Sequence, residues 1–178
     1  DWLPWNHTFG GNACFNMILR NGGTLYIDGG KPAPGLVEIT AMNLREISPT
    51  MYFNVPRGFD LLMPMLEQDQ GLRRSFFREL DLVFYAGAAL PQNLWERLEK
   101  LALEEKGGNL AMLSAWGSTE TAPMASCVHF PIDRAGVVGG CFLGSQGDGS
   151  KVNDWYYAPM TLDQAKRECD SPGTWLDP

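Results

Sequence analysis

Residues 82–115, LVFYAGAALPQNLWERLEKLALEEKGGNLAMLSA, decide the fold. The segment opens with a short apolar run at residues 82–85, which is typical of a buried strand. Pro91 then stands at a favourable first position of a helix. The residues that give this helix an apolar face are Leu94, Trp95, Leu98 and Ala102. A second strand is predicted at residues 110–115, and the order strand, helix, strand without a hairpin signal predicts a βαβ unit with parallel strands.

The same alternation of strands and helices extends upstream of this unit. Helices are predicted at residues 11–21, 36–47, 59–66 and 73–80, and short β-type runs at residues 24–27 and 51–55. Gly22 and Pro49 follow two of the helices at positions where helices commonly stop. We therefore predict an α/β fold in which helices flank a mostly parallel sheet.

The pattern degrades after about residue 131. Residues 133–149 are rich in glycine, and residues 151–178 show only a weak helical signal at 162–169. We therefore expect one domain at residues 1–139 and a divergent, poorly ordered tail at residues 140–178. Few long-range contacts are expected from residue 145 onward.

The composition narrows the class of protein and of partner. With 44% hydrophobic and 20% charged residues, the 178-residue chain has enough apolar side chains for a core. A net charge of -7 with no long basic tract argues against a nucleic-acid partner. No apolar run reaches the roughly eighteen residues of a membrane helix, so no membrane insertion is expected. The four widely spaced cysteines do not fit a zinc site, and without a secretory signal at its start the chain is expected to be cytoplasmic.

Small and polar residues follow the predicted strands. In a parallel sheet, ligands bind where the chain leaves the carboxyl ends of the strands. The segments at these positions are residues 6–8 (NHT), 28–30 (DGG), 56–57 (PR), 87–89 (GAA) and 117–120 (GSTE). We expect all of these segments to lie at one edge of the sheet, where they would form a ligand site.

The segment after the last predicted strand, residues 117–121 (GSTET), could serve two purposes. Hydroxyls and backbone amides can hold phosphate oxygens, and the carboxylate of Glu120 is a suitable ligand for Mg²⁺. The same residues could equally begin a helix, with a hydroxyl as N-cap and Glu120 in the first turn. Taken alone, this segment favours the helix start.

Two other segments are open to more than one interpretation. Gly87, Ala88 and Ala89 would let a flat ring approach the backbone, but small residues also permit a tight turn between a strand and a helix. His7 could be a pocket wall, an acid–base group or a polar residue satisfied in a turn, and the last is the default interpretation.

Three spaced segments resemble the adenylate-forming superfamily, which contains acyl-CoA synthetases, adenylation domains and luciferases. They are residues 1–10 (DWLPWNHTFG), 84–91 (FYAGAALP) and 115–123 (AWGSTETAP), in the order of the family. Together with residues 21–27 and 52–56, the first segment is most similar to bacterial feruloyl-CoA synthetases. The resemblance extends from residue 1 to about residue 139 and implies a central fragment, part of the large N-terminal domain of such an enzyme.

The resemblance implies a role for each matching residue. Glu120 matches the acidic residue that holds Mg²⁺, and Thr119 matches the threonine that contacts the α-phosphate of the adenylate. His7 matches the histidine of the acyl-pocket wall near the thiol entry. The residues implied to bind the nucleotide are Gly87, Ala88, Ala89, Trp116, Gly117 and Ser118. Trp116 stands where many members have a tyrosine, so stacking beside the adenine is retained but the hydroxyl is not.

The implied reaction is the ATP- and Mg²⁺-dependent activation of a carboxylic acid as its adenylate, followed by transfer to coenzyme A. A wall of rings from His7, Phe9, Tyr52 and Phe53 would suit a flat aryl acid such as a hydroxycinnamate, although these rings could be plain core. A fatty-acyl-CoA ligase and a non-catalytic truncated fragment are the alternatives. The phosphate loop, the ribose-binding aspartate and the catalytic lysine of the family have no match, so the chain alone is expected to be inactive.

Overall fold

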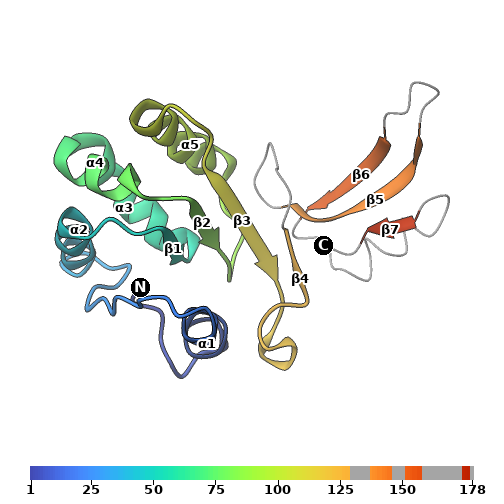
Figure 1. Cartoon of the computed structure of the whole chain (residues 1–178), viewed down its shortest axis with the longest axis horizontal. Helices are drawn as coiled ribbons and strands as arrows, with labels where there is room; N and C mark the ends of the chain where they lie inside the picture. The colour runs from blue at the N-terminus through green and yellow to red at the C-terminus, as the bar shows by residue number, and fades with distance from the viewer. Residues whose placement is uncertain (129–136, 146–150, 158–173, 177–178) are drawn as a thin grey trace.

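A computed structural model describes residues 1–128 together with the backbone of residues 137–145, 151–157 and 174–176. Its main sheet has its strands in the order β1-β2-β3-β4 (Figure 1). Strands β1 (Met51–Asn54), β2 (Leu82–Tyr85) and β3 (Ala111–Trp116) are parallel, and the short β4 (Ser126–Cys127) is antiparallel to β3. The predicted α/β fold with a mostly parallel sheet is therefore confirmed.

Buried side chains alternate between the two faces of the main sheet, because successive residues of a strand point to opposite sides. Tyr52, Val83 and Met112 are in register across the parallel strands, and they belong to the larger buried cluster. Phe53 and Phe84 are the next residues along their strands and belong to a smaller cluster. The sheet thus separates two cores of different size.

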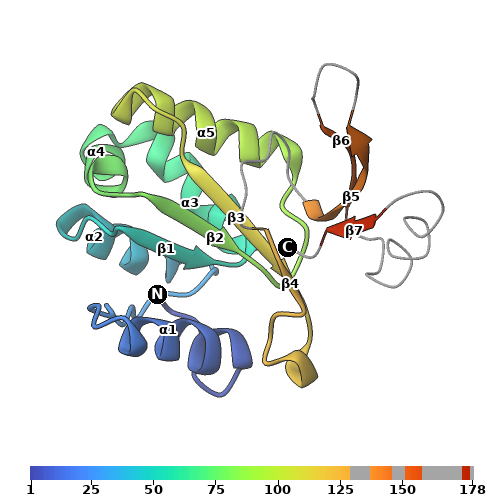
Figure 2. The same ribbon diagram turned by 45° about the vertical axis from the view of Figure 1, so that its right-hand side comes forward.

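Helices cover the face with the larger cluster, which we call the four-helix face. They are α2 (Val37–Glu46), α3 (Pro56–Gln68), α4 (Gln70–Arg78) and α5 (Gln92–Lys106) (Figure 2). Leu66, Phe76 and Leu98 are fully buried beneath them. Asp69 caps α4, because its side chain accepts a hydrogen bond from the backbone N–H of Leu72 at 3.0 Å. Within the described residues, no helix is both long and apolar enough to cross a membrane.

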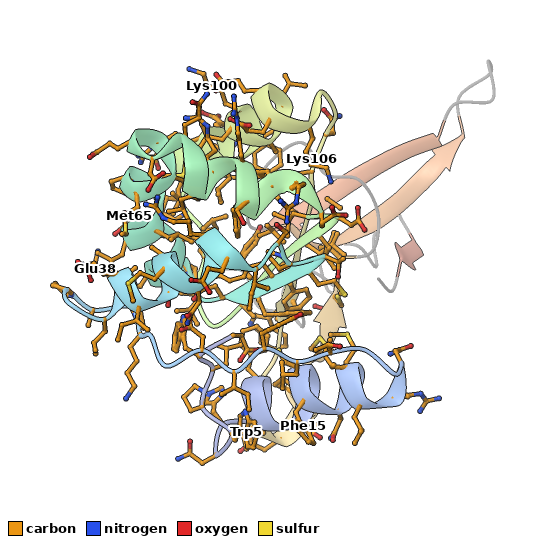
Figure 3. All side chains as sticks on the ribbon, turned by 60° about the vertical axis from the view of Figure 1, so that its left-hand side comes forward. Trp5, Phe15, Glu38, Met65, Lys100 and Lys106 are labelled. Atoms are coloured by element: carbon orange, nitrogen blue, oxygen red, sulfur yellow. The ribbon has the colours of Figure 1, made fainter. Side chains whose placement is uncertain are left out.

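The other face, which we call the N-terminal face, is covered by a π-helix, η1 (Thr8–Cys14), that continues into α1 (Phe15–Arg20). This helical segment begins earlier than the predicted helix at residues 11–21. Leu3, Phe9 and Cys14 are buried here against the sheet. Trp5 and Phe15 lie side by side on the outer side of the segment, with ring centroids 5.3 Å apart (Figure 3).

Residues 24–27, which the sequence predicted as a strand, belong to no strand of the sheet. They lie beside the first residue of the chain. The amino nitrogen of Asp1 donates to the carbonyl oxygen of Tyr26 at 2.6 Å, and the backbone N–H of Asp28 donates to the carbonyl oxygen of Asp1 at 2.8 Å. The Asp28 carboxylate accepts hydrogen bonds from the side chains of Thr40 and Asn43 at 2.5 and 2.9 Å, so residues 28–30 are tied to α2.

A second sheet follows in the described backbone beyond residue 136. Its central strand, β5 (Val137–Ser145), pairs antiparallel with β6 (Lys151–Tyr157) and with β7 (Thr174–Leu176). Few long-range contacts were expected after residue 145. The pairing of β6 and β7 with β5 contradicts that expectation. The weak helical signal at residues 162–169 lies outside the described residues, and the division into a domain at 1–139 and a tail at 140–178 stays a prediction.

Candidate functional site

The carboxyl ends of three strands meet at one edge of the main sheet. β1, β2 and β3 run in the same direction, so the segments that follow them, residues 56–57, 87–89 and 117–120, lie at this edge, as predicted. Residues 6–8 and 28–30 were predicted to follow strands as well, but no strand precedes either segment, so that part of the prediction is wrong. Residues 28–30 are held by α2 instead. The sheet edge therefore brings together the two segments from which the sequence predicted a nucleotide site.

The turn after β2 has little side-chain bulk. Gly87 has a φ of +88°, in the left-handed region that favours glycine. Ala88 and Ala89 are exposed, whereas Leu90 is buried in the larger cluster and fixes the end of the turn. Trp116, the last residue of β3, is 38% exposed, so part of its indole is open to solvent. This arrangement leaves a backbone segment and an aromatic surface accessible to a flat ligand.

The turn after β3 is tight and held by its own residues. A Cβ atom at Gly117 would lie 1.7 Å from the carbonyl oxygen of Pro123, so no larger residue fits the turn as it stands. The Thr121 hydroxyl accepts a hydrogen bond from the backbone N–H of Ser118 at 2.9 Å and donates one to its carbonyl oxygen at 3.0 Å. Residues 117–121 are all exposed on this turn.

The helix start that the sequence favoured is present, but only as a single turn. Ser118 occupies the N-cap position of the 3-10 helix η2 (Thr119–Thr121). Ala122 then adopts a φ of +60°, which ends the turn, and residues 123–128 do not continue it as an α-helix. The turn therefore lacks the aligned peptide dipoles with which the N-terminus of an α-helix would attract an anion.

Glu120 projects a charged carboxylate from this turn into solvent. The pKa of its carboxyl lies below the ordinary value, first because the Ser118 side chain hydrogen-bonds to it and second because its own backbone N–H does so. An ionised carboxylate is the ligand type that Mg²⁺ prefers. Within residues 1–128, where side chains are described, no three or more His, Cys, Asp and Glu residues gather as a metal cluster. Glu120 thus fits a Mg²⁺ ion that takes its other ligands from water and phosphate oxygens.

The N-terminal segment reaches the same turn through a residue that the sequence analysis missed. The Asn12 side chain donates to the carbonyl oxygen of Ala122 at 2.8 Å, across 110 positions of sequence. His7 lies on this segment, exposed, and its Nδ1 accepts from the backbone N–H of Phe9 at 3.1 Å as the N-cap of η1. That is the geometry of a polar residue satisfied in a turn. An asparagine inside a helical segment gives no sequence signal of so distant a contact.

Of the two alternatives for the aromatic rings, a pocket wall or plain core, the structure favours the core for Phe9, Tyr52 and Phe53. Tyr52 and Phe53 are neighbours in β1 and lie in the two clusters on opposite faces of the sheet. The Tyr52 hydroxyl accepts from the Asn54 side chain at 3.0 Å, and burial raises the pKa of this tyrosine. Phe9 and Phe53 both pack on Phe84. The distance to the ring centroid of Phe84 is 5.8 Å from that of Phe9 and 5.6 Å from that of Phe53. These rings are core residues.

Two solved structures share the fold. A long-chain-fatty-acid–CoA ligase from Archaeoglobus fulgidus is 19% identical with a TM-score of 0.54, over 84% of this chain and 30% of its own. A malonyl-CoA ligase, solved as a ternary product complex with methylmalonyl-CoA and AMP, is 22% identical with a TM-score of 0.56. That match covers 92% of this chain and 37% of the ligase. This chain thus spans about a third of the length of each ligase, and at these identities the similarity shows the fold.

A search of curated proteins finds no match to the chain. The family model described as AMP-binding enzyme, in contrast, matches residues 2–153. The matched range includes the parallel strands of the main sheet and the turns after β2 and β3. Because this match extends over most of the sequence, the chain belongs to the family of AMP-binding enzymes.

Proposed function

We propose that this chain is part of an ATP-dependent acid–CoA ligase, which forms an acyl-adenylate and then a thioester. The observation that supports this most is the pair of turns at the carboxyl edge of the sheet, residues 87–89 and 116–121, in a chain of the AMP-binding family. The first turn offers backbone without side-chain bulk. The second offers hydroxyls and an ionised carboxylate.

We assign the adenine to the turn after β2. The exposed backbone of Gly87, Ala88 and Ala89 would lie against one face of the purine, because none of these residues has a side chain that would keep a ring away. Trp116 follows the neighbouring strand, and its partly exposed indole would stack beside the base.

We assign the phosphates to the turn after β3. Thr119 is proposed to contact the α-phosphate, while Gly117 and Ser118 would fix the backbone of the turn around it. Glu120 would hold Mg²⁺. A bound Mg²⁺ would neutralise charge on the phosphates and orient them for in-line displacement.

The chemistry consists of two displacements. In the first, an oxygen of the substrate carboxylate attacks the α-phosphorus of ATP, the bond to the bridging oxygen breaks, and pyrophosphate leaves. In the second, the sulfur of coenzyme A attacks the acyl carbon, the thiol proton is lost to solvent, and AMP leaves. The residues of this chain supply no nucleophile to either step. Their contribution is to position the nucleotide and to compensate its charge.

We further propose an aryl acid, such as a hydroxycinnamate, as the substrate. This proposal rests on the similarity of residues 1–10, 21–27 and 52–56 to feruloyl-CoA synthetases, and the buried rings described above do not add to it. His7 is proposed to lie at the wall of the acyl pocket, near the entry of the thiol. Its segment is joined to the phosphate turn through Asn12.

Titration of the chain with AMP, followed by amide chemical shifts, tests the nucleotide assignment. Saturable shifts are expected at residues 87–89 and 116–121. Ala88→Leu is expected to abolish them, because the larger side chain would cover the exposed backbone. Ala111→Leu is the matched control, since Ala111 is exposed at the other end of β3. AMP binding that survives Ala88→Leu unchanged would contradict the assignment.

A further inference from the structure

The turn after β3 belongs to a longer loop, residues 117–125, that is closed at its base. There the backbone N–H of Ala125 donates to the carbonyl oxygen of Trp116 at 2.9 Å, and Trp116 stands opposite Ser126 in the pairing of β3 with β4. Residues 117–122 are all exposed, so little packing against the core holds them. The position of these residues therefore depends on hydrogen bonds.

One of these hydrogen bonds comes from η1, which lies beside the loop (Figure 2). The side chain of Asn12 donates to the carbonyl oxygen of Ala122 at 2.8 Å. η1 packs closely on the segment before it because residue 11 is glycine, and a Cβ atom there would lie 2.1 Å from the carbonyl oxygen of Trp5. The backbone N–H of Gly11 also donates to the carbonyl oxygen of His7 at 2.9 Å. The residue before Asn12 is thus fixed in position, and the backbone of Asn12 with it.

The amide group of Asn12 is held at both of its polar atoms. Its oxygen Oδ1 accepts a hydrogen bond from the side chain of Asn16 at 2.8 Å, while its nitrogen Nδ2 donates to Ala122. An amide whose oxygen and nitrogen are both engaged in this way has one preferred orientation. On the side of the loop, the backbone N–H of Ala122 donates to the carbonyl oxygen of Thr119 at 3.2 Å. A continuous series of hydrogen bonds therefore runs from the helical segment to Thr119, the neighbour of Glu120.

We propose that Asn12 is a positioning residue for the nucleotide phosphate, a role that rests on the proposed function. Asn12 holds the carbonyl group of Ala122, and it thereby keeps Thr119 and Glu120 in the place where the α-phosphate and Mg²⁺ would bind. A site that is ordered in advance binds more tightly, because less conformational entropy is lost on binding. The turn after β2, residues 87–89, leads into α5 and takes no part in this series of hydrogen bonds. Binding of the adenine should therefore not depend on Asn12.

Comparison of AMP with adenosine tests this role, because the two ligands share the adenine and the ribose and differ in the phosphate. Their dissociation constants are measured on the whole chain, in the presence of Mg²⁺, from amide chemical shifts. The unaltered chain should bind AMP more tightly than adenosine. Asn12→Ala is expected to weaken the binding of AMP by roughly fivefold, the effect of one lost hydrogen bond, and to leave the binding of adenosine unchanged. A residue that only stabilised the fold would not separate the two ligands.

Two further variants separate the hydrogen bond from the side chain that provides it. Asn12→Gln keeps an amide donor on a longer, flexible side chain, and it should restore the affinity for AMP to within about twofold of that of the unaltered chain. Asn16→Ala is the matched control, because it removes an asparagine from the same helical segment and leaves Asn12 and Ala122 in place. Water can replace the lost donor at the exposed side chain of Asn12, so AMP binding should not change. Urea unfolding shows that each variant is folded.

Three outcomes would overturn the proposal. If Asn12→Ala binds AMP with unaltered affinity, or loses affinity for AMP and adenosine equally, Asn12 does not position the phosphate. If Asn12→Gln loses as much affinity for AMP as Asn12→Ala does, the hydrogen bond is not the cause. Failure of the proposed function is distinguishable, because it is measured on the unaltered chain alone. No preference of that chain for AMP over adenosine would remove the phosphate from the turn after β3, and the role of Asn12 with it.

Discussion

The two faces of the main sheet are built differently. On the four-helix face, side chains such as Phe76, Phe77 and Leu98 have no exposed surface. On the N-terminal face, the buried cluster is small and is bordered by partly buried residues such as Trp2 and Met17. The turn after β3 joins the N-terminal face through the hydrogen bond that Asn12 donates to Ala122. The larger part of the buried core therefore lies on the four-helix face.

Truncation of a buried ring should have its largest effect on the four-helix face. Phe76 makes edge contacts with Tyr52 and Phe77, with ring centroids 5.2 and 4.9 Å apart. Phe76→Ala is expected to lower the free energy of unfolding by about 4 kcal/mol, because its neighbours are fully packed and cannot close the cavity. Phe9→Ala, the matched change on the N-terminal face, should cost about 3 kcal/mol, since partly buried neighbours can relax into the space. Urea unfolding followed by circular dichroism measures both, and equal losses would remove the distinction between the faces.

Local sequence patterns predicted each helix and strand of the four-helix face, although the predicted helices at 59–66 and 73–80 differ by two to three residues from α3 and α4. The apolar runs at residues 82–85 and 110–115 predicted β2 and β3 to within one residue, and Pro91 with the helical stripe that follows predicted the presence and start of α5. Residues 24–27 show where such patterns stop being sufficient. Their composition indicates extended backbone, but a strand also needs a partner, and Asp1 alone provides two hydrogen bonds.

The sequence likewise predicted one part of the candidate site and missed another. The order of strands placed residues 87–89 and 117–120 at one edge, because parallel strands end together. The structure favours core over a pocket wall for the aromatic rings because Tyr52 and Phe53 are consecutive in a strand, and the period of two puts them on opposite faces. Asn12 could not be found, since its partner lies 110 positions away and only tertiary structure brings the two together.

The hydrogen bond from Asn12 on the N-terminal face to Ala122 in the turn after β3 should contribute modestly to stability. Asn12→Ala removes the exposed hydrogen bond to Ala122 and is expected to cost about 1 kcal/mol or less. It should also speed amide exchange at Thr121 and Ala122. Asn16→Ala is the matched control, because Asn16 donates to Asn12 at 2.8 Å and makes no bond to the turn. Unchanged exchange in the turn of the Asn12 variant would show that the two segments are held together by other contacts.

An ion pair on the four-helix face should give a small dependence of stability on pH. Arg97 in α5 donates two hydrogen bonds to Glu67 in α3, at 2.8 and 2.7 Å, and this holds the pKa of the Glu67 carboxyl below its usual value. A lowered pKa in the folded state stabilises the fold above the unfolded value of about 4.3, and this contribution is lost as the pH falls through the lower folded value. Both side chains are more than a third exposed, so less than about 1 kcal/mol is expected.

Arg97→Gln should flatten this acid dependence of the free energy of unfolding. Arg78→Gln removes the same charge from an exposed pair on α4 whose nitrogen and oxygen are 3.7 Å apart, and it serves as the control. Urea unfolding of both variants and of the unaltered chain, measured at a series of pH values from neutral to acid, provides the comparison. If both variants retain the full acid dependence of the unaltered chain, the pair contributes nothing to it.

The smallest effect on stability is expected at Glu120, where the effect on function should be decisive. The carboxylate is fully exposed on the turn after β3, so Glu120→Gln removes its charge without disturbing any buried group. In a longer ligase that contains this chain, the variant should lose Mg²⁺-dependent adenylate formation, because an amide oxygen is a far weaker ligand for Mg²⁺ than a carboxylate. Its thermal midpoint should change little, because an exposed amide oxygen can still accept the hydrogen bonds that reach the carboxylate. Glu38→Gln, at an exposed position of α2 (Figure 3), is the control for loss of one negative charge and should retain activity. Near-normal adenylation with an unaltered requirement for Mg²⁺ would leave Glu120 as a residue of the turn alone, and the assignment of the phosphates to this edge of the sheet would then fall with it.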